Sequence, residues 1–253
     1  MRILPRMNAP FVSPRFHLGI VTGLQFEATI AEDAIRSATE PPGDDRVTAT
    51  CHGPGQARAL SAAEALINIG ASALLSFGVA GGCNPDLPPG TVVIATGIRD
   101  LSTVGAGDIL YTNRGWQHRL KSLLLGNVLL EEGTIASVAE PVHGADAKRR
   151  LYEDGGAAAV DMESAAAARA AMEAGIPFMA LRVIVDAAGT SLPPAAMAGM
   201  TPDGATQIGP VLRALLRRPQ DIPGLIGIGI ADSRARKAMK RASAVAAPLF
   251  GGV

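Results

Sequence analysis

The sequence predicts an α/β protein with three layers, in which helices flank both faces of a central twisted mixed sheet. Apolar and β-branched runs punctuated by glycine alternate with Ala-rich helical stretches along the chain. These runs are nearly continuous, as expected for strands that helices cover on both faces. No shift in composition and no internal repeat divides the 253 residues, so a single domain over 17–253 is expected.

The strands are expected where short apolar runs are bounded by turn residues. They are predicted at 17–21, 47–51, 73–77, 91–96, 133–138, 158–161 and 178–185. Helices are expected in segments rich in alanine, the best helix former. They are predicted at 55–69, 145–153, 163–174, 203–216 and 222–241. The glycine-rich segment 99–116 is predicted as a long loop or a strand pair, and 191–194 as a loop.

Composition excludes several classes of partner. The 23 Lys and Arg balance 23 Asp and Glu, and no long basic run occurs, which argues against nucleic acid and for a small-molecule partner. No apolar run is long enough for a membrane span, and residues 1–16 lack the apolar core of a signal peptide. These residues are predicted to be a flexible N-terminal extension. The expected location is the cytoplasm, with Cys51 and Cys83 reduced and buried.

Several common motifs are absent or incomplete. Gly53-Pro-Gly55 follows a predicted strand and opens a helix, where backbone N–H groups can meet an anion, but it lacks the spacing of a dinucleotide fingerprint. There is no Walker lysine motif and no nucleophile elbow. The cysteines and the four histidines lack metal-ligand spacing, so no metal is expected.

Carboxylates at the ends of three predicted strands are the strongest functional signal. Glu27 follows the first strand, Asp161 and Glu163 stand where a strand runs into a helix, and Asp186 closes the last strand. Ligands of layered α/β folds gather at such strand ends. Each residue also has an ordinary structural interpretation, because Asp186 could cap a helix or pair with Arg182, and Glu163 suits a first helical turn.

In the order and separation of its motifs, the chain resembles the purine nucleoside phosphorylase and nucleosidase superfamily. This superfamily includes the methylthioadenosine/S-adenosylhomocysteine nucleosidases. The resemblance runs from about 17 to 188 and rests on five segments: 77–82, 88–93, 160–163, 175–178 and 182–186. Within the superfamily, 161–164, 192–194 and 215–219 most resemble the hopanoid-associated phosphorylases, which are thought to release adenine from adenosylhopane.

The resemblance implies cleavage of the N-glycosidic bond of a purine nucleoside, with residue roles that follow from the charges that develop. The sugar becomes cationic and the departing base anionic. Asp186 would supply a proton at purine N7, Glu163 would accept hydrogen bonds from the ribose hydroxyls, and Met162 would pack beneath the ribose. Other substrate contacts are expected from Asp161, from the turn Gly78, Val79, Ala80 and Gly81, and from the backbone of Val142, with Arg182 as a third catalytic residue.

The route of cleavage stays open at this stage. Glu27 matches the carboxylate that activates water in the nucleosidase branch, and its charge disfavours a phosphate dianion. The nearest family name is nevertheless a phosphorylase, for which inorganic phosphate would be the co-substrate. The sequence also departs from the nucleosidase pattern, with Val79 in place of a serine and Pro141 in place of a stacking aromatic residue. Stacking on the base is then expected from Phe26, Phe77 or Trp116.

Three functional classes compete. The favoured one is an enzyme that acts on a purine nucleoside or an adenosyl-lipid, with methylthioadenosine/S-adenosylhomocysteine nucleosidase as an alternative. The others are a non-catalytic nucleoside-binding module, which the retained carboxylates oppose, and a scaffold protein. The resemblance implies a homo-oligomer, a dimer or larger. The apolar stripe that begins at Ile222 allows subunit contact or peripheral contact with a membrane, from which a lipid substrate would be collected.

Overall fold

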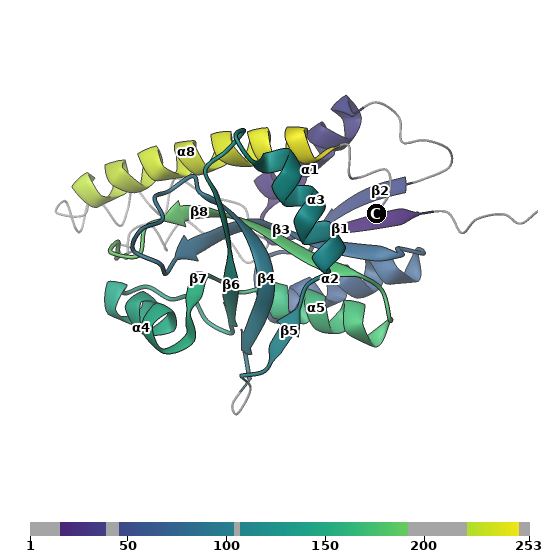
Figure 1. Ribbon diagram of the computed structural model, residues 1–253, viewed down its shortest axis with the longest axis horizontal. Helices are drawn as coiled ribbons and strands as arrows, with labels where there is room; N and C mark the ends of the chain where they lie inside the picture. Colours follow the sequence, from purple (N-terminus) through teal and green to yellow (C-terminus); the bar gives the residue numbers. More distant parts are fainter. Residues whose placement is uncertain (1–15, 39–45, 104–106, 192–221, 248–253) are drawn as a thin grey trace, which may run out of the picture.

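The computed structural model describes residues 16–38, 46–103, 107–191 and 222–247 (Figure 1). The predicted extension at 1–16, apart from Phe16, lies outside these ranges, as do the predicted helix at 203–216 and all but the first residue of the predicted loop at 191–194. In the described part of the chain, no helix has the length and apolar character that a membrane crossing requires.

The strands of the described residues join in a single sheet of eight. Their bounds are β1 (His17–Thr22), β2 (Arg46–Cys51), β3 (Ala73–Gly82), β4 (Val92–Leu101), β5 (Ile109–Tyr111), β6 (Leu130–Val138), β7 (Ala157–Asp161) and β8 (Phe178–Asp186). The order across the sheet is β2-β1-β3-β7-β6-β4-β5, and β8 pairs with both β3 and β4. Parallel and antiparallel pairs both occur, which confirms the predicted mixed sheet.

The pairings also close a ring that the sequence did not predict. They run from β3 to β8, β4, β6 and β7 and back to β3, because β3 pairs with β7 at Gly81 and Gly82. This closure brings the last residues of β3 beside those of β7 and β8. Side chains at three strand ends therefore meet in a small space.

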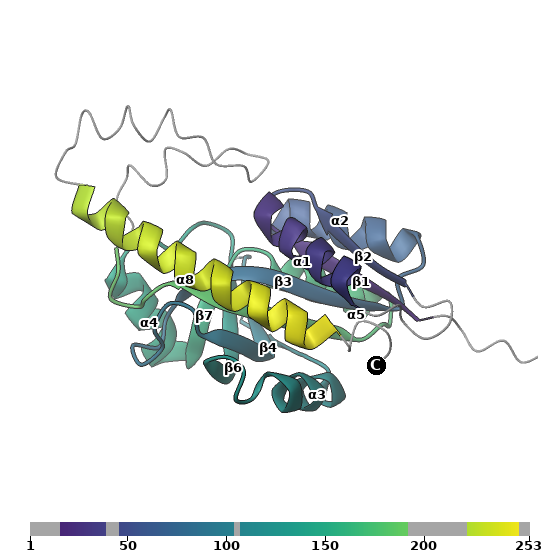
Figure 2. The same ribbon diagram turned by 90° about the horizontal axis from the view of Figure 1, so that it is seen from above.

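Helices cover both faces of the sheet, as predicted (Figures 1 and 2). Their bounds are α1 (Gln25–Ser37), α2 (Gln56–Asn68), α3 (Arg114–Leu124), α4 (Ala145–Gly155), α5 (Ser164–Glu173) and α8 (Ile222–Ala246). One hydrophobic core packs α2 and α5 against the sheet, and a second core packs α1, α3 and α8 on the other face. The helix α4 packs beside β7.

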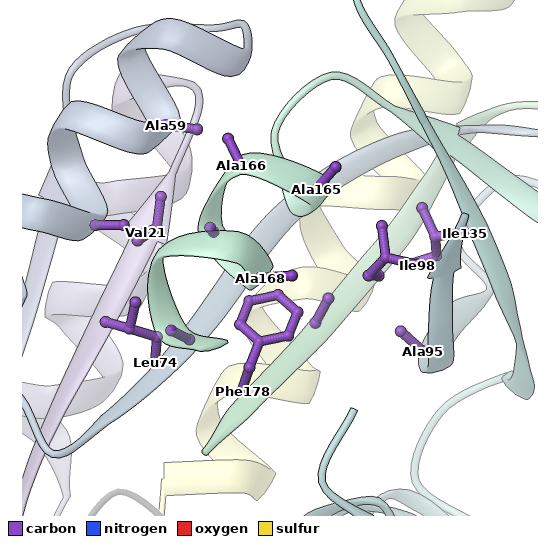
Figure 3. Close-up of a cluster of buried hydrophobic side chains, with 14 of the residues drawn as sticks. Val21, Ala59, Leu74, Ala95, Ile98, Ile135, Ala165, Ala166, Ala168 and Phe178 are labelled. Atoms are coloured by element: carbon purple, nitrogen blue, oxygen red, sulfur yellow. The ribbon is translucent and has the colours of Figure 1, made fainter. Parts of the chain in front are cut away.

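Small side chains explain the close packing of α5. Figure 3 shows Ala165, Ala166 and Ala168 of this helix in the core, with Ala166 toward Ala59 of α2 and Ala168 beside the ring of Phe178. Alanine keeps helix propensity high and lets two helices and a strand approach closely. Each methyl group buried there contributes about 0.8 kcal/mol. The predicted Ala-rich helix is thus a central element of the fold.

The sequence missed the helices α1 and α3. The segment 99–116 contains an antiparallel pair, with Gly97 opposite Tyr111 and Arg99 opposite Ile109, so the strand-pair interpretation is confirmed and the long loop is wrong. The helix α3 follows at once, and the side chain of Asn113 accepts a hydrogen bond from Trp116 N (3.0 Å) as its N-cap. Asn at the N-cap position is a sequence signal for the start of a helix.

Both cysteines are free. Cys83 is fully buried, and burial raises the pKa of its thiol to about 12. Cys51 is only partly buried, so the prediction of two buried residues is wrong for Cys51, which lies in the strand β2 at the end of the sheet order.

Candidate active site

A cavity of about 170 Å³ lies where β1, β3, β6, β7 and β8 end. Its polar wall holds the predicted carboxylates, and the rest is mostly aliphatic. The described lining residues are Gly23, Leu24, Glu27, Pro54, Val79, Ala80, Gly81, Val138, Pro141, Val142, Val160, Asp161, Met162, Glu163, Val185 and Asp186. A concave, largely apolar pocket with a few convergent polar groups is typical of a small-molecule site.

Glu27 is anchored by backbone N–H groups from two elements. Its Oε2 accepts hydrogen bonds from Gly23 N and Leu24 N (both 2.9 Å), at the start of α1, and its Oε1 accepts one from Val79 N (2.8 Å) in β3. A carboxylate offers roughly four acceptor positions, so one is left for a ligand or a water molecule. The residue is 2 % exposed, and burial raises its pKa, while the N–H of Val79 and the charge of Arg182 oppose that rise.

Gly78 leaves room for the Glu27 carboxylate, although it does not line the cavity. A Cβ at this position would lie 2.7 Å from Oε1 of Glu27. We expect Gly78→Ala to displace this carboxylate and lower kcat by at least about tenfold, or 1.4 kcal/mol in the barrier. Steady-state kinetics check this. Gly227→Ala is the matched control, because a Cβ there meets nothing within 4 Å, and a Gly78→Ala enzyme as active as this control would contradict the assignment.

The turn from β7 into α5 is built on Asp161. Its Oδ1 accepts from Glu163 N (3.3 Å) and Ser164 N (3.2 Å), and its Oδ2 accepts from the hydroxyl of Ser164 and from Arg182 Nε (2.7 Å). Such side-chain bonds to the following N–H groups fix a turn locally. Asp161 lines the cavity, but these contacts occupy both oxygens, so the geometry favours a role in positioning Glu163.

Arg182 lies behind the cavity wall rather than in it. Its guanidinium also donates to Ser76 Oγ (2.7 Å) and Ser164 Oγ (3.0 Å), while Nη1 has no partner among the described residues. The side chain is 2 % exposed and is absent from the lining. The structural alternative in which Asp186 pairs with Arg182 is wrong, because Asp161 is the carboxylate partner of Arg182. Its assignment as a catalytic residue stays a prediction, and its contacts are structural.

Glu163 is held from the opposite side by the loop before α2. Its Oε1 accepts from Gly55 N (2.9 Å) and its Oε2 from Met162 N (3.2 Å). Gly55 has a φ of 100°, in the region that favours glycine. The Gly53-Pro-Gly55 segment therefore does meet an anion, but this anion is the protein's own carboxylate. The interaction joins residues that are far apart in sequence and fixes Glu163 at the cavity.

Burial raises the pKa of Glu163 to about 7, and the negative charges of Asp161 and Glu27 add to this effect. The ordinary value is 4.5, so ionisation of Glu163 costs folding free energy that is absent below about pH 4.5 and grows until about pH 7. We expect Glu163→Gln to gain stability relative to the native chain over this range, by up to about 3 kcal/mol.

Urea unfolding between pH 4.5 and pH 8 measures this difference. Glu173→Gln is the control, because it makes the same substitution at an exposed position at the other end of α5. If the difference in the free energy of unfolding between Glu163→Gln and the native chain did not change with pH, the surroundings of Glu163 would not raise its pKa. Because the same variant loses the carboxylate that faces the ligand, it should also bind a nucleoside more weakly.

A bulge presents Asp186 to the cavity. The register between β3 and β8 shifts between Ala80 and Gly81, so that Ala80 opposes Ile184 while Gly81 opposes Asp186. The residue left over is Val185, and both Val185 and Asp186 line the cavity, which regular alternation would not allow. Burial raises the pKa of Asp186, and the charge of a neighbouring lysine opposes this shift.

That lysine is Lys148 in α4, which sequence reasoning missed. Its ammonium group donates to Oδ2 of Asp186 and to the backbone oxygens of Ala187 and Thr190 (both 3.1 Å). In the sequence, only the three-residue spacing between Lys148 and Leu151 indicates that the two side chains share a face of α4. The run Lys148-Arg149-Arg150 otherwise looks like a solvated surface.

The predicted aromatic stacking on the base is wrong. The ring of Phe26 lies 3.6 Å from the guanidinium carbon of Arg236, and Phe77 and Trp116 are core residues with 2 % exposure. None of the three lines the cavity. Aliphatic groups of Val138, Pro141 and Val142 are available in their place. In the described part of the chain, no cluster of three or more His, Cys, Asp or Glu has a geometry that could hold a metal ion.

The comparisons with known proteins agree with this architecture. Residues 24–217 match the family model described as the phosphorylase superfamily. No curated protein matches the sequence.

Solved structures share the fold at low sequence identity. The futalosine hydrolase of Helicobacter pylori strain 26695 aligns with a TM-score of 0.67 at 18 % identity, over 92 % of this chain and 97 % of the other. A putative 5′-methylthioadenosine/S-adenosylhomocysteine nucleosidase from Francisella philomiragia gives 0.67 at 20 %, over 94 % and 99 %. The corresponding enzyme from Neisseria meningitidis, in complex with methylthio-immucillin-A, gives 0.68 at 15 %, over 94 % and 99 %.

The matched segment contains every predicted site residue, from Glu27 to Asp186, and covers most of the chain. The sequence motifs, the mixed α/β fold and the family model lead to the same assignment. The chain belongs to the phosphorylase superfamily.

Proposed function

We propose that this enzyme hydrolyses the N-glycosidic bond of a purine nucleoside and releases the base. The observation that carries the proposal is the cavity itself, in which Glu27, Glu163 and Asp186 converge while no Lys, Arg or His is present among the described lining residues. Cleavage leaves positive charge on the sugar and negative charge on the base. Carboxylates stabilise the positive charge on the sugar, and a proton donor neutralises the negative charge on the base.

Each residue has a role that its contacts support. Glu27 takes a proton from the attacking water, because its anchored carboxylate has an acceptor position to spare. Glu163 accepts hydrogen bonds from the ribose hydroxyls and stabilises the cationic sugar, beneath which Met162 packs. Asp186 passes a proton to purine N7, and the backbone of Val142 reads the edge of the base.

Electrostatics favour water over phosphate as the nucleophile. A phosphate dianion would share the cavity with four carboxyl groups and would find no cationic side chain in the described lining. Phosphate sites usually contain Arg or Lys together with N–H donors. Arg182 is engaged by Asp161, Ser76 and Ser164. Inorganic phosphate is therefore not a required co-substrate in this proposal, and the reaction needs no metal or organic cofactor.

The candidate nucleoside substrates differ from one another in their 5′ substituent. The mostly aliphatic lining suits a thioether or a hydrocarbon, as in methylthioadenosine or an adenosyl-lipid such as adenosylhopane. The helix α8 opens with the apolar sequence 222–230, where Ile230 is 52 % exposed, which is compatible with contact to a membrane or a second subunit. The superfamily relative from Neisseria meningitidis holds methylthio-immucillin-A. Adenosylhopane cleavage, membrane contact and oligomer formation remain predictions.

A substrate panel tests the proposal. Purine nucleosides with a 5′ hydroxyl, thioether or long hydrocarbon group are incubated with the enzyme, and the free base is measured by chromatography and mass spectrometry. We expect adenine from at least one member of the panel and no base from uridine or cytidine. Binding of a purine nucleoside without release of its base would instead support the non-catalytic binding module.

A further inference from the structure

Lys148 is a charged residue in an unusual place. It is the one buried residue of α4, and its side chain is 1 % exposed, while the neighbouring Arg149 is exposed. Removing an ammonium group from water costs several kcal/mol unless hydrogen bonds and an opposite charge compensate for it. A residue of this kind at the edge of the candidate active site calls for a functional explanation.

Its contacts use the whole ammonium group. The three N–H bonds of Nζ can be matched to Oδ2 of Asp186 and the backbone oxygens of Ala187 and Thr190. Lys148 thereby connects α4 to the end of β8 and to the turn that follows it. The Asp186 carboxyl is fixed at the cavity, and its nearest hydrogen-bond donor is a group that can give up a proton.

This arrangement resolves a difficulty in the chemistry. An Asp186 paired with an ammonium group is a carboxylate at rest, and a carboxylate has no proton to give to a departing base. A proton source is therefore required, and among the described residues Lys148 is the side chain that donates to this carboxyl.

We propose that Lys148 acts on the reaction through Asp186, by holding its carboxyl in place and by supplying the proton that Asp186 passes to the leaving purine. This inference rests on the proposed function. As the C–N bond breaks, its electron pair leaves with the base. Lys148 gives a proton to the Asp186 carboxylate, Asp186 gives a proton to purine N7, and the neutral lysine amine regains its proton from solvent after the product has left.

The surroundings permit this transfer. Burial favours the neutral form of Asp186, whereas the charge of Lys148 favours the anion, so the two effects oppose each other. The neighbouring Cys83 thiol has a pKa raised to about 12 and stays neutral. Across the cavity lie Asp161, which Arg182 neutralises, and the carboxyl groups of Glu27 and Glu163.

The pH dependence of kcat distinguishes proton supply from simple packing. In the native enzyme the Lys148–Asp186 pair holds a proton that can pass to the leaving base. In Lys148→Met, Asp186 must hold the proton alone, so the alkaline limb should move down by at least about one pH unit. At pH 9 we expect kcat for a purine nucleoside to fall by on the order of 100-fold, and at pH 6 by less than about tenfold.

Two further variants sharpen the test. Arg149→Met removes a charge from the adjacent exposed position and should leave kcat and its pH profile unchanged. Lys148→Met combined with Asp186→Asn should be no slower than Asp186→Asn alone, because the lysine acts only through this carboxyl. The proposal would be overturned if kcat of the double variant fell by the product of the two single-variant losses. An alkaline limb of kcat that does not shift in Lys148→Met would also overturn it.

The native enzyme provides the same readout if Lys148→Met does not fold. Above the acid limb set by the carboxylates, its kcat should hold as pH rises to 8, whereas a loss of kcat on raising the pH toward 8 would overturn the role of Lys148. Turnover of the purine nucleoside by the native enzyme is measured first. Its complete absence would refute the proposed function, while normal turnover with the wrong pH profile would refute only the inference about Lys148.

Discussion

Replacement of Glu27 by glutamine is expected to lower kcat by about 10²–10⁴-fold, because an amide cannot take a proton from the attacking water. The side-chain volume is nearly unchanged. Its carbonyl oxygen can still accept hydrogen bonds at the start of α1 or from Val79, although the amide NH₂ will face one of these N–H donors. Steady-state kinetics on purified enzyme, together with thermal unfolding to confirm the folded state, measure the effect.

The pH profile of the native enzyme gives the same residue a second test. Burial raises the pKa of Glu27, so the acid limb of kcat should lie above the ordinary value of 4.5. Activity should be present above this limb and lost as pH falls through it, because only the ionised carboxylate is a base. Glu32→Gln, at an exposed position of α1, is the control. A Glu27→Gln enzyme that keeps more than a tenth of native turnover would refute the role in water activation.

Replacement of Asp186 by asparagine is expected to reduce both turnover and stability. Loss of the proton relay to the base should lower kcat by about 10²–10⁴-fold. The variant also leaves the Lys148 ammonium buried without its counter-charge, and breaking a buried ion pair in this way typically costs about 3–5 kcal/mol. Kinetics well below the unfolding temperature separate the two effects.

Asp154→Asn is the matched control, because this residue lies at an exposed position of α4. Its kcat and unfolding midpoint should equal those of the native chain. A less than tenfold loss of kcat in Asp186→Asn, which corresponds to about 1.4 kcal/mol in the barrier, would show that Asp186 is not the proton donor. Unchanged stability would contradict the buried pair with Lys148.

The sequence was sufficient to place the three carboxylates because each stands at or just after the end of a strand in a recognisable local pattern. Glu27, Glu163 and Asp186 all line the cavity, as their positions at strand ends predicted. The β7–α5 turn is also local, since Asp161 bonds to the two N–H groups that follow it. Interactions of this kind depend on neighbours in sequence and can be read without the fold.

Contacts between distant segments were beyond the reach of the sequence. Lys148 stands in a polar stretch that looks exposed, and its burial follows from the position of α4 against the end of β8. Arg182 is close to Asp186 in sequence, but the strand directs it to Asp161 and away from the cavity. The aromatic residues expected at the base pack into the cores instead, because large apolar groups gain more from full burial.

The identity of the sugar product tests the proposed hydrolysis most directly. The enzyme is incubated with a purine nucleoside that it cleaves, once in phosphate-free buffer and once with added inorganic phosphate, and the sugar is analysed by phosphorus NMR and mass spectrometry. Hydrolysis predicts equal rates in the two buffers and a free pentose in both. A reaction that requires phosphate and yields a pentose 1-phosphate would contradict it.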